Sequence, residues 1–92
     1  MVRNLEQSDF DKIINFGAFG YGNEKMSFIL ELPLDYVDKE MKNKDSVFYK
    51  KYQTGSHKSD YVLDLKLFEM AQGGDLKALE EYEFRKKKRL SE

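Results

Sequence analysis

The sequence has no cysteine and no tryptophan, and it holds one proline and one histidine in 92 residues. Without cysteine the chain forms no disulfide and no thiolate metal site, so we expect a protein of a reducing compartment. The single histidine, His57, has no cysteine partner for a zinc site or a catalytic dyad, and the glycine fingerprints of nucleotide sites are missing. We therefore predict that the protein is not an enzyme and that it uses no metal or cofactor.

Long apolar runs are also missing. No stretch approaches the roughly 18 residues that span a membrane, and residues 1–7 lack the apolar centre of a signal peptide, so we expect a soluble protein without a membrane partner. The apolar fraction of 40%, with 7 Phe and 6 Tyr, argues against disorder. Sustained alternation with period two is absent, and this pattern predicts one all-α domain.

Residues 60–84 have the pattern of two antiparallel helices joined by a tight turn. Gly73 or Gly74 can adopt the left-handed conformation that ends a helix, and Asp75 can accept hydrogen bonds from the first N–H groups of the next helix. The apolar positions of this hairpin exceed what one short partner helix can cover, which predicts that the surplus faces another element of the chain, another subunit, or both. The candidate interface residues are Tyr61, Leu65, Phe68, Leu76, Leu79 and Tyr82.

Two short helices are expected near the N-terminus. Ser8 to Asp11 can cap the first, and the glycine-rich stretch from Gly17 to Gly22 is expected to break it. Asn23 is a plausible cap for the second, which Pro33 interrupts. Its buried side is expected to hold Met26, Phe28, Ile29, Leu30 and Leu32.

A third helix is expected from about Tyr36 to Asn43, with Asp35 as its cap and Val37 and Met41 facing inward. Two short helices joined by a turn of about four residues, the second with a basic outer face, form a helix-turn-helix. Tyr36 and Lys39 would then lie nearest the base edges of DNA. A solvent-exposed amphipathic face is the competing interpretation of the same residues.

A long fourth helix follows, opened by Asp45 and Ser46. Gly55 weakens it, and we favour a helix that continues through this glycine with a possible kink. Residues 33–59 carry six basic and four acidic side chains, so a local anion-binding surface is expected here. The candidate DNA-binding residues are Tyr36, Lys39, Lys42, Lys44, Lys50 and Lys51.

These expectations divide the chain into three parts. Residues 1–44 form the helix-turn-helix region, residues 45–84 the long helix and the hairpin, and residues 85–92 a basic tail. The run from Arg85 to Arg89 can bind DNA or an acidic partner, or it can be a solvated helix end that complements the helix dipole.

Several short motifs occur in an order that resembles a known family. These are Phe19-Gly20-Tyr21, Leu32-Pro33-Leu34-Asp35, the segment from Asp45 to Gly55, and the segment from Leu67 to Leu79 with its Ala-Gln-Gly-Gly-Asp turn. Together they are similar to the small subunit of the DNA-packaging terminase of tailed bacteriophages.

The resemblance implies a viral DNA-recognition protein without enzymatic activity. Its members carry a helix-turn-helix around a ring built from a helical hairpin, bind double-stranded viral DNA, and regulate the large ATPase and nuclease subunit. The resemblance also implies action in the cytoplasm of the infected bacterial host. Two alternatives stay open: a dimeric helix-turn-helix transcription regulator, whose recognition helices would lie roughly 34 Å apart, and a phage adaptor or virion protein that binds only proteins.

Overall fold

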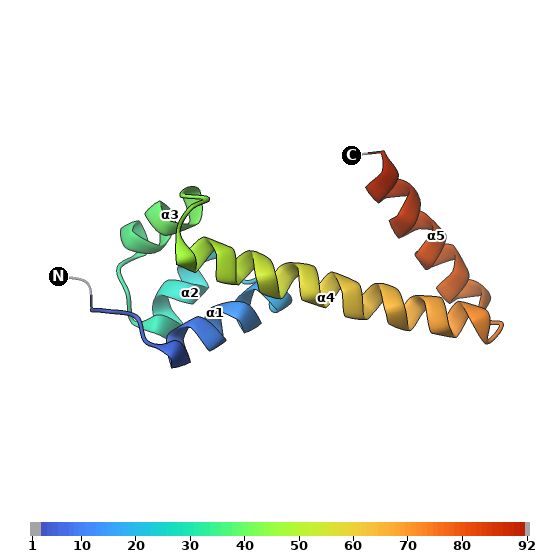
Figure 1. The fold of residues 1–92 in the computed structure, drawn as a ribbon, viewed down its shortest axis with the longest axis horizontal. Coiled ribbons are helices and arrows are strands. Elements are labelled where there is room, and N and C mark those ends of the chain that lie inside the picture. Colours follow the sequence, from blue (N-terminus) through green and yellow to red (C-terminus); the bar gives the residue numbers. More distant parts are fainter. Residues whose placement is uncertain (1–2, 92) are drawn as a thin grey trace. The chain divides into compact units, whose positions relative to one another are not determined.

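The structure, a computed structural model, describes residues 3–91, which are helical with short connections (Figure 1). The predicted all-α class is confirmed. In this part of the chain the helices are α1 (Gln7–Phe19), α2 (Asn23–Leu30), α3 (Leu34–Lys42), α4 (Val47–Gln72) and α5 (Leu76–Leu90). The contacts divide the chain into two units between Ser59 and Asp60, within α4, and each unit is described by itself below.

The α1 helix begins earlier and ends later than its sequence suggests. Its N-cap is Glu6, and the Asp9 carboxylate accepts a hydrogen bond from the Glu6 N–H at 2.8 Å. The expected cap at Ser8 is therefore wrong, because Asp9 lies inside the first turn and closes the helix end from there. The helix passes through Gly17 and ends at Gly20, which has a φ of 73°.

Gly17 does not break α1, because it forms half of a close helix crossing. A Cβ on Gly17 would lie 2.8 Å from the carbonyl carbon of Tyr52, and a Cβ on Gly55 would lie 2.7 Å from the carbonyl carbon of Ile14. The backbones of α1 and α4 thus touch at these two glycines, and no side chain fits between them. The expected continuity of α4 through Gly55 is confirmed.

The core of residues 3–59 forms where α1, α2 and α3 gather around the first turns of α4 (Figure 1). Its buried members are Ile13, Phe16, Met26, Leu30, Leu32, Val37 and Phe48. The predicted burial of Phe28 and Ile29 is wrong, since their exposed fractions are 75% and 43%. Met26 and Leu30 lie four residues apart and define the inward face of an eight-residue helix, which leaves the other two outside it.

The ends of α2 and α3 also differ from the expected caps. Gly22 caps α2, so Asn23 is its first residue. Glu31 ends it in the left-handed conformation, with φ of 56°. Pro33 occupies the N-cap position of α3, and Asp35 lies within the first turn instead of capping it. The proline ring fixes φ near the value needed at a helix entrance, so this turn is stiff.

Residues 60–91 contain the predicted turn between two helices. Gly74 has a φ of 95°, and the Asp75 carboxylate accepts a hydrogen bond from the Ala78 N–H at 3.0 Å. Across the turn, Arg85 of α5 lies 2.7 Å from Asp64 of α4. The glycine and aspartate roles expected at this turn are confirmed. The basic residues after position 84 form the last turns of α5.

Candidate nucleic-acid interface

The outer face of α3 carries charges of both signs. Val37 is buried and Met41 packs against the core, as expected, so the opposite face of the helix is directed to solvent. That face carries Asp35 in its first turn and Lys39 and Lys42 toward its C-terminal end. The charge therefore changes sign along the helix that was expected to recognise DNA.

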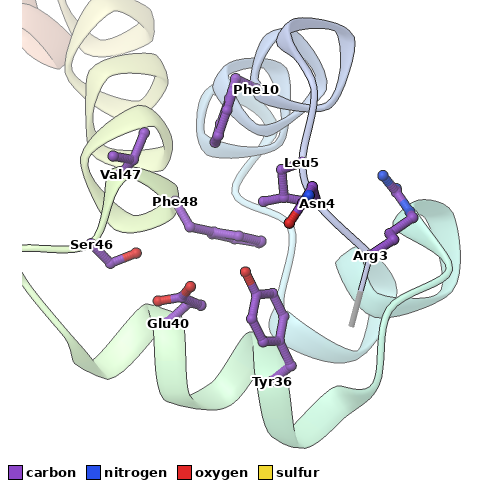
Figure 2. Close-up of a pocket in the computed structure, with 9 residues that line it drawn as sticks. All are labelled: Arg3, Asn4, Leu5, Phe10, Tyr36, Glu40, Ser46, Val47 and Phe48. Atoms are coloured by element: carbon purple, nitrogen blue, oxygen red, sulfur yellow. The ribbon is translucent and has the colours of Figure 1, made fainter. Parts of the chain in front are cut away.

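Tyr36 does not lie on this outer face. Its side chain is half-buried and points from α3 toward Phe48 of α4, beside Glu40 (Figure 2). Burial raises the pKa of the Tyr36 phenol, and the neighbouring Glu40 carboxylate raises it further. The predicted outward position of Tyr36 is wrong. Its aromatic ring lies at the margin of the buried face of α3, where it packs against the core.

An open cleft of about 580 Å³ lies over this ring (Figure 2). It is formed by the N-terminal segment, α1, α3 and the start of α4. Its lining residues are Arg3, Asn4, Leu5, Phe10, Tyr36, Glu40, Ser46, Val47 and Phe48. The apolar part of the lining continues the core, so the cleft marks the place where the core reaches the surface.

Four lysines, Lys39, Lys42, Lys44 and Lys50, are exposed on α3, on the turn that follows it and on the start of α4. We call them the lysine group. The side chain of Lys51 is half-buried, so it is less accessible than its neighbour Lys50. The structure thus keeps four of the predicted basic candidates on the surface of residues 3–59.

The acidic side chains of α3 have different partners. Asp38 accepts a hydrogen bond from the side-chain amide of Asn23 at 2.9 Å, which ties the start of α2 to α3. Asp35 is exposed, and its carboxylate accepts a hydrogen bond only from the adjacent Tyr36 N–H among the bonds found within residues 3–91. Asp35 lies in the first turn of the helix, where the dipole favours negative charge.

Arg3 is a basic residue that the sequence did not single out. Its guanidinium donates hydrogen bonds to both carboxylate oxygens of Asp9, at 2.7 and 2.9 Å, and to the Leu30 carbonyl at 2.8 Å. The hydrogen bonds that Asp9 accepts from Arg3 and from the Glu6 N–H lower its pKa to about 2. Arg3 therefore joins the N-terminal segment to α1 and α2. No local pattern predicts this contact, since its partners lie 6 and 27 residues away.

The candidate subunit-interface residues lie on α4 and α5. Within residues 60–91, Ala78 is the buried apolar residue, at 4% exposure. Tyr82 is half-buried, with its ring centroid 5.6 Å from that of Phe68. The other candidates are exposed: Tyr61, Leu65, Phe68, Leu76 and Leu79. Further large apolar residues that the prediction did not include are also exposed: Val62, Leu63, Met70, Phe84 and Leu90.

The basic run of α5 is divided between two roles. Arg85 and Arg89 lie 2.7 and 2.9 Å from the two carboxylate oxygens of Asp64, and Arg85 is 3.6 Å from Asp60. The pKa of Asp64 is lowered by the hydrogen bond from Arg85. The lysines at positions 86–88 are exposed. The two arginines thus stabilise the pairing of α4 with α5, and the lysines keep their charge toward solvent.

Among residues 3–91, no group of three or more acidic or histidine side chains is placed to hold a metal ion, and none of the helices is both long and apolar enough to cross a membrane. Comparison of the chain with protein-family models, curated proteins and solved structures gives no significant match.

Proposed function

We propose that the chain is the DNA-recognition subunit of a phage packaging terminase, a small subunit that assembles into a ring and regulates the large ATPase and nuclease subunit. In this proposal α2 and α3 act as the helix-turn-helix, and α4 and α5 from Asp60 onward make the subunit contacts. Double-stranded viral DNA and the large subunit are the partners, in the cytoplasm of the infected host.

The observation that carries the proposal is the apolar surface of residues 60–91. Ten of the fifteen large apolar side chains that are exposed in the described chain belong to this stretch. Monomeric proteins rarely expose contiguous apolar surface of more than a few hundred Å². Further copies of the chain would cover this surface, and repetition around a closed ring would also multiply weak contacts with DNA.

The DNA-binding part of the proposal is supported by the lysine group. All four side chains are exposed, and they lie on consecutive elements between residues 39 and 50. Lysine ammonium groups pair with phosphate oxygens and release counterions, so the proposed binding weakens as the salt concentration rises. The motif order described for the sequence supports the packaging role in particular.

The test of the proposal is the molar mass of the native particle, measured by light scattering after size exclusion at moderate salt. A single mass of roughly seven or more chains is expected for a closed ring. A chain with Leu65→Asp and Leu79→Asp together is expected to lose this mass and become a monomer or a small oligomer. The matched control is Val47→Asp, since Val47 is exposed and lies in residues 3–59.

A dimer in this measurement would contradict the ring and favour a transcription regulator, which would then have to bind a palindromic site. A large particle that binds no duplex at low salt would favour an adaptor or virion protein. The exposed acidic residue Asp35 in the first turn of α3 is the feature that favours the adaptor or virion protein.

A further inference from the structure

We propose that the chain binds duplex DNA through its phosphates alone, without reading base sequence. The lysine group makes these contacts, and the proposal rests on the proposed DNA-binding function. The surface runs from the C-terminal half of α3 across the following turn to the start of α4. The N-terminal half of α3 stays out of the groove.

The first reason is the position of the Asp35 carboxylate. Helices that read the major groove contact base edges with their N-terminal residues. In the first turn of α3 the exposed acidic residue is Asp35. Entry by this end would place its carboxylate between the two phosphate backbones, where like charges repel.

The second reason is the absence of side chains suited to base edges at this end of the helix. Tyr36, the residue best suited to such a contact by its place in the first turn, faces the cleft and Phe48 (Figure 2). Asp38 is held by Asn23. Leu34 and Asp35 are the remaining exposed residues of the first turn, and neither offers the bidentate donor pattern that reads guanine or the amide that reads adenine.

The third reason is the grouping of positive charge at the opposite end. Lys39 and Lys42 lie in the last turns of α3, near its negative pole, while Lys44 and Lys50 follow within eight residues. Glu40 is half-buried and lines the cleft beside Ser46 (Figure 2). Asp45 is the exposed acidic side chain between residues 39 and 50. The exposed charged side chains of this span are therefore four lysines and one aspartate, with a net charge of +3.

Two measurements on the full chain test the proposal. In the first, the wild-type protein selects from a random-sequence library of duplexes of roughly three helical turns, and the bound fraction is sequenced. No consensus is expected, with less than about tenfold preference for any sequence. In the second, fluorescence anisotropy gives the affinity for one such duplex at several salt concentrations. Lys42→Gln, Lys44→Gln and Lys50→Gln together are expected to lower the slope of log K against log salt by about 3.

Two control variants accompany the second measurement. Lys12→Gln, Lys25→Gln and Lys58→Gln together remove the same charge from exposed positions outside the lysine group and outside the proposed subunit contacts, and the salt slope is expected to stay within about 1 of wild type. Asp35→Asn is expected to bind at least as tightly as wild type, because it removes a repulsive charge. Far-UV circular dichroism of each variant verifies that the helices are retained.

The outcomes separate this proposal from the proposed function. A consensus sequence bound about 1,000-fold more tightly than others, or a loss of binding in Asp35→Asn, would overturn the phosphate-only mode and leave DNA recognition standing. An equal loss of slope in both triple variants would overturn the assigned surface. If the folded wild-type protein bound no duplex at low salt, both proposals would fall together.

Discussion

Residues 3–59 bury seven apolar side chains in one core, whereas residues 60–91 bury one, Ala78. The apolar content of the two regions differs far less than the number of apolar side chains that they bury. The difference in burial comes from what surrounds these side chains. In the first region four helices meet and cover one another. In the second, two helices pair through ion pairs and one aromatic contact, and most of their apolar surface stays exposed.

The two regions therefore owe their stability to different sources. Burial of apolar surface is the main favourable term in folding, and it is available to residues 3–59 within one chain. Residues 60–91 bury one apolar side chain within the chain, so they gain much less from burial to set against the entropy of ordering two helices. In the proposed ring, neighbouring subunits would supply the missing burial, so the second region would be stable only in the assembly.

Two phenylalanines provide the strongest test of this comparison. Phe48 is 2% exposed and Phe84 is 66% exposed. Phe48→Ala is expected to lower the free energy of unfolding of residues 3–59 by about 4 kcal/mol, since it removes a buried ring and leaves a cavity. Phe84→Ala is expected to change the same free energy of unfolding by less than about 0.5 kcal/mol. Urea denaturation, followed by tyrosine fluorescence and circular dichroism, measures both values, and equal losses would contradict the division.

The helix crossing gives the next largest effect. Gly55→Ala is expected to destabilise residues 3–59 by about 3 kcal/mol, because the new Cβ meets the backbone of Ile14 and Ala18 and pushes α1 from α4. The gain in helix propensity, about 1 kcal/mol, offsets part of the clash. Gly22→Ala is the control, since a Cβ there meets nothing within 4 Å. A Gly55→Ala protein as stable as wild type would show that the helices cross more loosely.

These glycines also show what the sequence predicts and where its information ends. The turn at Gly74 and Asp75 and the helices themselves follow from local patterns, because their determinants lie within a few residues of one another. The crossing of α1 with α4 at Gly17 and Gly55 depends on contacts between residues that are 35 to 41 positions apart in the chain. Gly17 therefore resembles a helix breaker when its own neighbourhood alone is considered, and Gly55 resembles a weak point of a continuous helix.

The same limit applies to the candidate site. The exposed lysines at positions 39, 42, 44 and 50 could be predicted from helical periodicity and charge. The inward turn of Tyr36 could not, because it depends on Phe48, which arrives from another helix (Figure 2). The hydrogen bond from Arg3 to the Leu30 carbonyl could not be predicted either, because it joins residues 27 positions apart.

The hydrogen bonds from Arg3 to Asp9 are expected to make a moderate, pH-dependent contribution to the stability of residues 3–59. Asp9 has a pKa of about 2 in the folded chain, below its ordinary value of 3.8. The contribution of the Asp9 charge to the free energy of unfolding is therefore fully present above pH 4 and is lost as the pH falls through 2. Asp9→Asn is expected to cost about 1–2 kcal/mol at pH 7, at the low end because Arg3 is 44% exposed and screened by solvent.

Unfolding free energies of wild type and Asp9→Asn between pH 7 and pH 2 measure this contribution. The difference between the two proteins is expected to shrink as the pH falls below 4. Asp11→Asn is the matched control, since Asp11 is exposed on the same helix. A constant difference across this range would mean that Asp9 stabilises α1 only through its shape and hydrogen-bonding position, without its charge.

The smallest effect is expected in the second region, at the ion pairs between α4 and α5. Arg85→Gln removes the contacts with Asp60 and Asp64 and is expected to weaken α5 by about 0.5–1 kcal/mol, because these charges are partly exposed. Lys86→Gln changes charge by the same amount at an exposed neighbouring position and is expected to have almost no effect. Hydrogen exchange of the α5 amides measures both. The Arg85→Gln effect should diminish at high salt, where the ion pairs are screened, and an effect as large at high salt as at low salt would assign it to lost packing of the arginine stem.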